Sequence, residues 1–106
     1  MANTFKNYAT AGVGTSPSTI LTASANTTVI GYSIANVTGT TITASVIVTA
    51  GGTDCYLIKD ALVPAGGALI PIGGDQKLVL EIGDVIKVST NTAASADVIM
   101  SVLEIT

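Results

Sequence analysis

Apolar and polar residues alternate along most of this chain with a period of two, which is the period of a half-buried β-strand. The clearest case is the segment 41–49, where Ile42, Ala44, Val46 and Val48 alternate with threonine, serine and isoleucine. No segment carries an apolar stripe at positions i, i+3 and i+4 over the ten or more residues that a helix needs. We therefore predict an all-β protein.

Glycine and proline residues divide the alternating segments into short strands. The predicted strands are Ser18–Ala23, Asn26–Val37, Thr41–Thr49, Asp54–Ala61, Ala68–Ile72, Leu78–Ile82, Val85–Val88 and Asp97–Ile105. About eight strands at this spacing indicate a single antiparallel β-sandwich with Greek-key or jelly-roll topology. The connection at residues 61–73 is long enough to cross between the two sheets, and Pro71 places its strand at an edge or a bulge.

The segment Gly73–Val88 predicts a β-hairpin. Leu78, Leu80 and Ile82 would share a buried face, and Gly83-Asp84 would supply the tight turn, because glycine tolerates positive φ and aspartate can bond its own backbone. Two other strands are expected to present apolar residues on one side: Ile30, Tyr32 and Ile34 in the first, and Ile99, Leu103 and Ile105 in the second.

The chain is short enough to form one domain, residues 1–106, in which residues 1–17 form an N-terminal arm with one short strand near Thr4–Thr10. The large apolar side chains of this arm are Phe5, Tyr8 and Val13. Terminal segments are poorly ordered unless they dock, so the arm is expected to dock on its own sheet or on a neighbouring subunit. If it docks on a neighbour, these three residues form the oligomer interface.

The composition of the chain argues against some classes of partner. Charged residues make up 10% of the chain, where about 25% is usual, and the net charge is −3. A basic face for nucleic acid is therefore excluded, and no apolar run reaches the roughly 18 residues of a membrane span. Because monomers usually keep soluble through surface charge, so neutral a surface suggests a homo-oligomer or a larger assembly.

The sequence offers few residues suited to catalysis. Without histidine there is no ready general base near neutral pH, and a single cysteine, Cys55, provides neither a disulfide nor a zinc site. Cys55 lies in an alternating strand, which favours a small buried hydrophobe. The carboxylates lie mostly at turns, where aspartate serves the backbone, and the Asp75 and Asp84 loops lack the spacing of a calcium site. We predict no enzyme activity, no cofactor and no metal.

Several segments resemble the small virion structural proteins of tailed bacteriophages, in particular cyanophage-like ones. They are the opening MANTFKN, YLIKD at Tyr56–Asp60 followed by Val63-Pro64 and Gly66–Leu69, GGDQKLVLE at Gly73–Glu81, and the closing SADVIMSVLEIT at Ser95–Thr106. The resemblance covers most of the chain. It implies a β-sandwich subunit that is assembled onto the particle, and it supplies no catalytic residues.

Within that class we expect a capsid decoration (cement) protein, a trimer that binds the major capsid protein or other virion proteins on the capsid surface. The opening residues contain no secretory signal, so synthesis in the host cytoplasm is expected. A ring component of the neck or tail is the alternative within the particle. A module that binds a host-surface glycan is a further alternative, although it would need a concave polar site with an aromatic shelf.

Overall fold

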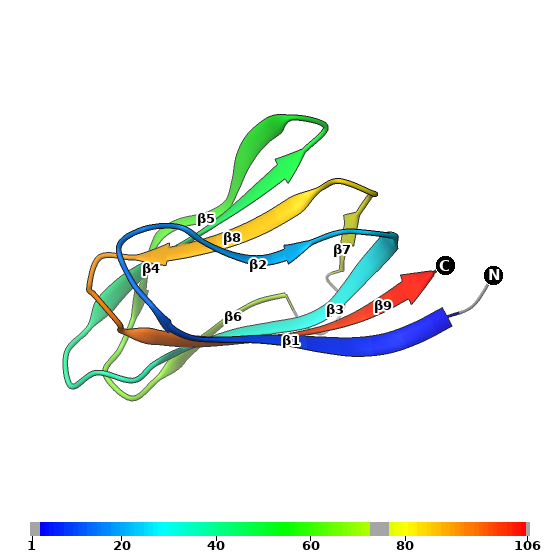
Figure 1. The fold of residues 1–106 in the computed structure, drawn as a ribbon. Helices are drawn as coiled ribbons and strands as arrows, with labels where there is room; N and C mark the ends of the chain where they lie inside the picture. Colours follow the sequence, from blue (N-terminus) through cyan, green and yellow to red (C-terminus); the bar gives the residue numbers. More distant parts are fainter. Residues whose placement is uncertain (1–2, 73–76, 106) are drawn as a thin grey trace.

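The structure is a computed structural model that describes residues 3–72 and 77–105. These residues form nine β-strands and contain no helix that could span a membrane. The strands are β1 (Asn3–Val13), β2 (Ser18–Thr22), β3 (Asn26–Asn36), β4 (Ile42–Ala50), β5 (Thr53–Val63), β6 (Ala68–Ile72), β7 (Leu78–Leu80), β8 (Val85–Thr90) and β9 (Ala96–Ile105). Figure 1 shows that they form two layers, with the start of β1 beside the end of β9.

The two layers are antiparallel sheets wound as a jelly roll. Sheet A has the order β1-β9-β3-β6, with the short β7 also paired to β3, and sheet B has the order β2-β8-β4-β5. Successive strands cross from one sheet to the other, except for the β4–β5 hairpin inside sheet B and the pair β6 and β7, which lie along the same side of β3. The predicted all-β sandwich is confirmed in its jelly-roll form.

The core fills the space between the sheets. Its fully buried large side chains are Val13, Val29, Ile34, Ile42, Val46, Val63, Leu80, Ile86, Val88, Met100 and Val102. The face predicted from the alternation in 41–49 is confirmed, since Ile42, Ala44, Val46 and Val48 are all buried. The connection from β5 to β6 crosses between the sheets as expected, and β6, which contains Pro71, is an edge strand.

The predicted hairpin at Gly73–Val88 is wrong. β7 pairs with β3 in sheet A, whereas β8 pairs with β2 and β4 in sheet B. The turn itself forms: Gly83 has a φ of 94°, and the Asp84 carboxylate accepts a bond of 2.9 Å from the Glu81 amide. It connects the two layers because backbone bonds of 2.8 Å tie Gly83 and Asp84 to Ala23, between β2 and β3. Residues 73–76 of the predicted hairpin lie outside the described part.

A bulge changes the face predicted for β3. The pairing with β9 shifts between Val29 and Gly31, so Val29, Tyr32 and Ile34 are buried, while Ile30 is half-buried and stands outside the core. The extra residue at a bulge reverses the alternation on either side of it. Sequence alternation alone could not reveal this reversal, because apolar residues lie on the inner face of β3 whether or not the strand contains the bulge.

Candidate interaction surface

Two charged side chains of sheet A, Lys6 and Glu104, form a compact cluster with Tyr8 on the inner face of the sheet. The Tyr8 hydroxyl donates a hydrogen bond of 2.5 Å to Glu104 Oε2, and Lys6 Nζ lies 3.2 Å from Glu104 Oε1. The Glu104 side chain is only 5% exposed, whereas that of Lys6 is 51% exposed. The β1–β9 register brings these residues together, because it pairs Lys6 with Val102 and Tyr8 with Met100 and sets Glu104 on the same face.

The hydrogen bond between Tyr8 and Glu104 shifts both groups away from their ordinary pKa values. It raises the pKa of Tyr8, and burial adds to the rise. It lowers the pKa of Glu104, with help from Lys6 and against the opposing effect of burial. Each acid therefore holds the form that the other requires, a neutral phenol and a charged carboxylate. This arrangement joins the side chains of β1 to those of β9.

Two aspartates elsewhere accept hydrogen bonds within the fold. Asp84 is nearly buried and accepts backbone bonds from Glu81 and Gly51. Asp54 accepts a hydrogen bond from the Thr49 hydroxyl. Among the described residues there is no group of three or more acidic or cysteine side chains that could hold a metal ion.

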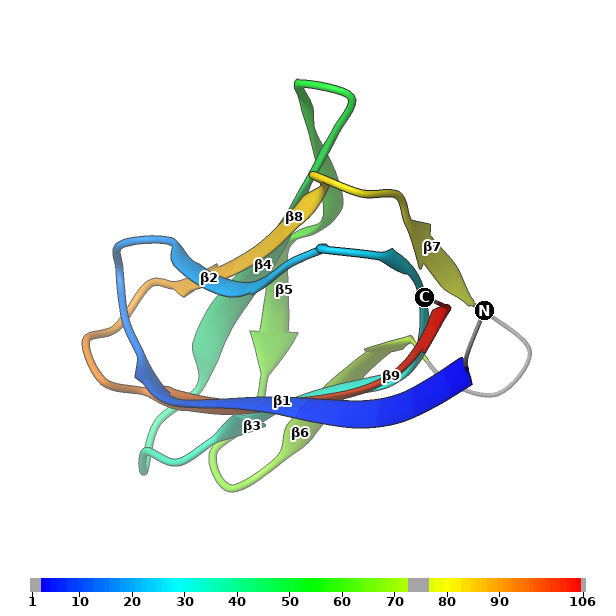
Figure 2. The ribbon, with the colours of Figure 1, turned by 45° about the vertical axis from the view of Figure 1, so that its right-hand side comes forward.

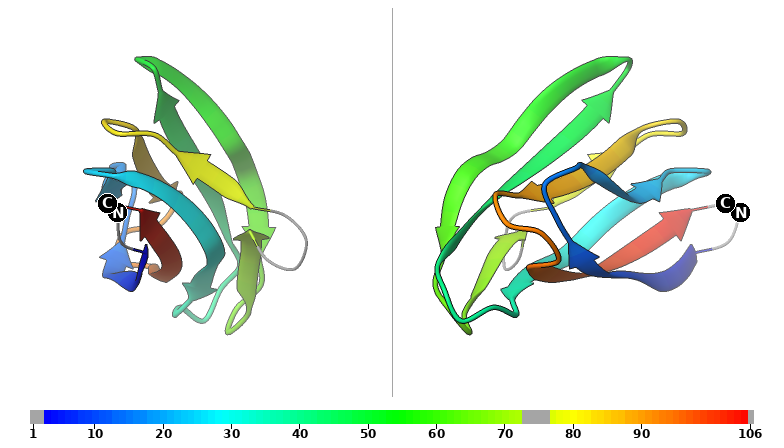
Figure 3. Two further views of the ribbon diagram at one scale, coloured as in Figure 1. Left: turned by 90° about the vertical axis from the view of Figure 1, so that its right-hand side faces the viewer. Right: turned by 60° about the vertical axis from the view of Figure 1, so that its left-hand side comes forward.

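Cys55 is exposed, which corrects the prediction of a buried side chain. It lies in the first half of β5, where the side chains of Thr53, Asp54 and Tyr56 are also exposed. Figure 3 shows that the tip of the β4–β5 hairpin projects past the opposite sheet, so neither of its faces is covered. Alternation predicts which residues share a face but not how far a strand extends beyond the core.

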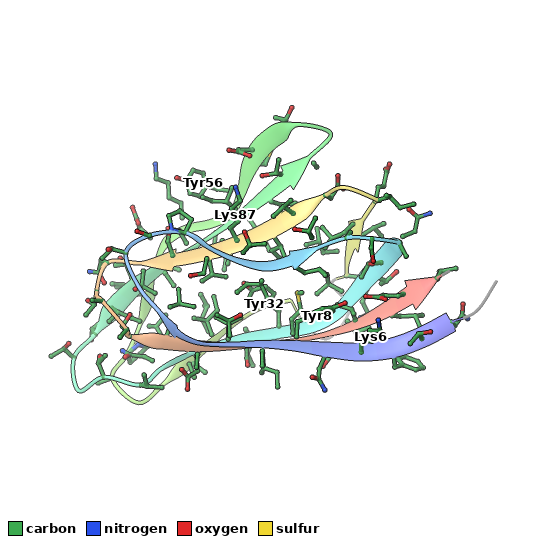
Figure 4. The ribbon with its side chains drawn as sticks, in the orientation of Figure 1. Lys6, Tyr8, Tyr32, Tyr56 and Lys87 are labelled. Carbon is green, nitrogen blue, oxygen red and sulfur yellow. The ribbon has the colours of Figure 1, made fainter. Side chains whose placement is uncertain are left out.

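The feature that stands out is the outer face of sheet A, which is almost free of charge. Of the three charged side chains on the described strands of this sheet, Lys6 and Glu104 turn inward and only Asp97 remains outside. Exposed apolar side chains occupy this face instead: Phe5, Ile70, Ile99, Ile105 and, on β7, Val79. Sheet B is different, since Asp54, Lys59, Asp60 and Lys87 lie on its strands and are exposed or half-buried. In Figure 4, Tyr8 points into the interior, whereas Tyr56 and Lys87 point away from it on the opposite side of the molecule.

A shallow hollow interrupts the outer face of sheet A. It has a volume of about 300 Å³. Small side chains from β1 and β3 form much of its lining, which comprises Ala9, Thr10, Ala11, Ser33, Ala35, Asp97, Val98 and Ile99. Asp97 is held at its rim, where Oδ1 accepts a bond of 3.1 Å from the Gly12 amide. A mostly apolar hollow with one fixed carboxylate suits an apolar side chain of another protein surface.

The three residues predicted for an interface lie in different surroundings. β1 pairs with β9 from Asn3 to Thr10 and again at Val13, so the first segment docks on its own sheet. Val13 is 1% exposed and belongs to the core, and Tyr8 is turned inward toward Glu104. Only Phe5 stands on the outer face, where it is 75% exposed. Its part in an interface stays a prediction.

Sequence reasoning missed the rest of the outer face. Ile99, Leu103 and Ile105 do share one side of β9, as predicted, but that side points away from the core. The signal was present, because the residues of β9 that alternate with them (Val98, Met100, Val102) are equally apolar. In many proteins a strand that is apolar on both faces is buried on both faces. In this subunit sheet B covers the inner face of β9, and the outer face is exposed.

Comparisons with known proteins support the fold. No protein-family model and no curated protein matches this chain. Among solved structures, a chain from Bacillus endospore appendages, described as disulfide-linked pili, superimposes with a TM-score of 0.57 at 13% identity. The match covers 96% of this chain and 87% of that one. A chain of infectious bursal disease virus, Gx strain, gives a TM-score of 0.53 at 12% identity and covers 96% of this chain and 32% of the viral one. At such low identity these likenesses show a shared fold.

Proposed function

We propose that this chain is a non-enzymatic structural subunit of a phage particle and that it decorates the capsid surface as a cement protein. The observation that carries the proposal is the difference between its two sheets. Sheet A offers an outer face of neutral polar and apolar side chains with the single charge of Asp97, while sheet B keeps charged side chains on its surface. A subunit that lies on a protein surface needs one face for that surface and one for water.

The mechanism is mechanical. A domain this small makes a modest contact with any one capsid subunit, but several linked copies bind with an avidity far above that of one contact. Contacts that bridge neighbouring capsid subunits oppose the outward pressure of packaged DNA. The partners are then the major capsid protein and further copies of this chain, and the place of action is the capsid surface.

The fold neighbours are compatible with a role in assembly. One belongs to a pilus and the other to a virus, so chains with this fold occur in repetitive structures. The sequence resemblance to virion proteins points to the phage particle, and the ring component of the neck or tail is the alternative there. The glycan-binding module lacks support from the hollow on sheet A, which is shallow and lined mainly by aliphatic side chains.

A filament subunit is a second candidate, and one observation favours it. The endospore pilus chain matches over nearly the whole length of both proteins, and Cys55 is exposed on the edge strand β5. Since Cys55 is the single cysteine, a disulfide can join the subunits only in pairs, so this candidate predicts filaments that yield covalent dimers on a non-reducing gel and monomers on a reducing one. The cement protein predicts assembly that is indifferent to reduction.

Immunogold electron microscopy tests the proposal. An antiserum against the purified chain is applied to particles from lysates in which the gene is expressed, with serum pre-absorbed on the pure protein as the control. Label spread over phage heads is expected. Label confined to necks or tails would transfer the function to the ring component, label along filaments would favour the pilus-like subunit, and particles without label would overturn a virion role.

A further inference from the structure

The four free sheet edges of this domain are not equally protected against pairing with another strand. β2 is five residues long and its pairing is irregular between Thr19 and Leu21. β6 is also five residues long and contains Pro71, and β7, which pairs with the same side of β3, has three residues. Short strands, bulges and proline are devices that keep edges from associating.

β5 is long, but it is protected in another way. Its pairing with β4 is irregular at two places, and Asp60 has a φ of 51°. It also carries Asp54, Lys59 and Asp60. A new strand would have to follow this irregular edge and cover charges at the same time, which is unfavourable.

β1 is the exception. It has eleven residues and no proline, and its pairing with β9 runs in unbroken register from Asn3 to Thr10. Figure 2 shows it in blue at the edge of sheet A, with no strand on its outer side. Its one charged residue is Lys6, which turns inward to Glu104. An inward lysine opposes strand addition when its charge must be buried alone, but here the carboxylate already neutralises it.

The outer face of β1 is also self-complementary. Phe5 projects from it, and the hollow lined by Ala9 and Ala11 lies four to six residues further along the same face of the same strand. In an antiparallel pair of β1 strands, directly opposite residues share a face and are about 5 Å apart. An aromatic side chain also reaches the diagonal neighbour. The hollow of about 300 Å³ exceeds the roughly 150 Å³ cavity that holds benzene.

We propose that two copies of this chain associate through antiparallel pairing of their β1 strands, across a two-fold axis at Asn7, with Phe5 of each copy in the hollow of the other. A two-fold interface requires one patch to contain both complementary parts, and β1 contains both. Because β1 is the one unprotected edge among the described strands, no second open edge exists for a ring or filament built by edge pairing.

The side chains of β1 also determine the register of the proposed β1–β1 pair, that is, the residue at which the two-fold axis crosses the strands. An axis at Asn7 sets Phe5 opposite Ala9 and uses the nine residues Asn3–Ala11, which end before the irregularity at Gly12. An axis at Lys6 would set the two lysines opposite each other, which is destabilising. An axis between two residues would set outward side chains against inward ones.

An axis at Tyr8 is also disfavoured. It would pair Asn3 with Val13 and Thr4 with Gly12, and so extend the new pairing into the irregular end of β1. The Gly12 amide is already bonded to Asp97 in the subunit. Asn7 is therefore the favoured position of the two-fold axis.

Pairing through β1 would enlarge the surface proposed to bind the capsid, although the dimer could form whether or not the chain is a cement protein. Joining two copies of sheet A makes one continuous sheet whose outer face is twice as wide and still carries only one charge per subunit. That wider face is the surface we propose to lie against the capsid. The trimer expected from the sequence is the competing arrangement, and native mass distinguishes the two.

The first test is light scattering after size exclusion, across loading concentrations that bracket the micromolar range expected for a small interface. The native mass should be twice the chain mass of 10.5 kDa. Phe5→Lys should raise the dissociation constant about 100-fold, tenfold for each of the two copies. The matched control is Leu62→Lys, which removes a side chain that is 71% exposed from the edge strand β5 and should leave the mass unchanged.

The second test fixes the register by cross-linking. In a Cys55→Ser background, Asn7→Cys places one thiol opposite its own copy, at the Cα separation that a disulfide needs. Oxidation should give a cross-linked dimer on a non-reducing gel, whereas Asn3→Cys, whose partner would be Ala11, should not. This experiment does not require Phe5 to be altered.

The outcomes separate the two proposals. A monomer at all concentrations, a trimer, or a dimer that neither responds to Phe5→Lys nor cross-links at position 7 would overturn the pairing through β1. Gold label on phage heads would still support the cement protein in each of those cases. A dimer with the predicted cross-link but no label on any particle would confirm the pairing and remove the virion role.

Discussion

Replacing Glu104 with glutamine should destabilise the fold by about 2 kcal/mol at pH 7. The carboxylate accepts a charge-assisted bond from Tyr8 and faces Lys6. Hydrogen bonds to charged groups contribute about 1.5–3 kcal/mol and neutral ones about 1 kcal/mol, so glutamine, which can still accept from Tyr8, forfeits roughly half of this bond. Loss of the half-exposed ion pair with Lys6 adds at most about 1 kcal/mol.

The effect should depend on pH in one direction. The folded state lowers the pKa of Glu104 below its ordinary value of 4.5, so its stabilisation is fully present above that value. It is lost as the pH falls through the folded-state pKa. The gap between wild type and Glu104→Gln should therefore be widest near neutrality and close in strong acid, where both side chains are uncharged.

Urea unfolding followed by circular dichroism measures the gap, and thermal unfolding gives a second estimate of about 8 °C for a domain of this size. Using the Phe5→Lys background keeps dissociation out of the transition. Glu81→Gln is the matched control, because it removes the same charge from an exposed side chain and should cost less than about 0.5 kcal/mol. A double-mutant cycle with Tyr8→Phe should give a coupling of about 1 kcal/mol or more. A pH-independent gap, or no coupling to Tyr8, would refute the reasoning.

Three further substitutions probe the core by the same urea titration. Met100→Ala should lower the free energy of unfolding by about 2–5 kcal/mol, because Met100 is fully buried between the sheets and truncation leaves a cavity. A loss below about 1 kcal/mol would mean that the two sheets move together and fill the cavity. Asn36→Ala should cost about 3 kcal/mol, since its amide nitrogen lies within bonding distance of three carbonyls, including Val63 O at 3.0 Å. Tyr32→Phe should be neutral or stabilising by up to about 1 kcal/mol, because the buried Tyr32 hydroxyl has no hydrogen-bond partner in the described structure and its burial raises its pKa. A clear loss of stability in Tyr32→Phe would show that the hydroxyl has a partner in solution.

Alternation was a good guide where a strand is regular and covered on one side. It placed β4 correctly, with Ile42, Ala44, Val46 and Val48 inside. It failed in β3, where the bulge at Ile30 moves the following residues to the opposite face of the strand. It also failed in β5, where the hairpin extends beyond the core and Cys55 is exposed. A bulge and an overhang depend on contacts with other strands, which a local period does not record.

The candidate surface was predicted only in part. Phe5 was predicted to lie in an interface because a large apolar side chain in a polar terminal segment stands out, and the structure shows that it is exposed. The hollow that could receive it was not, because alanine and serine carry no signal until β1, β9 and β3 lie side by side and their short side chains leave a common space.

The sequence by itself determined the fold class of the protein: the period of two, the β-branched strands and the glycine turns allow little except an antiparallel sandwich. Only the tertiary structure decided which strands pair, and with that which apolar face is inside. β7 and β8 are adjacent in sequence and read as a hairpin, yet they belong to different sheets. The reason is that backbone groups of any two strands can pair equally well, so the partner is chosen by how all the apolar faces are buried together, which is a property of the whole chain.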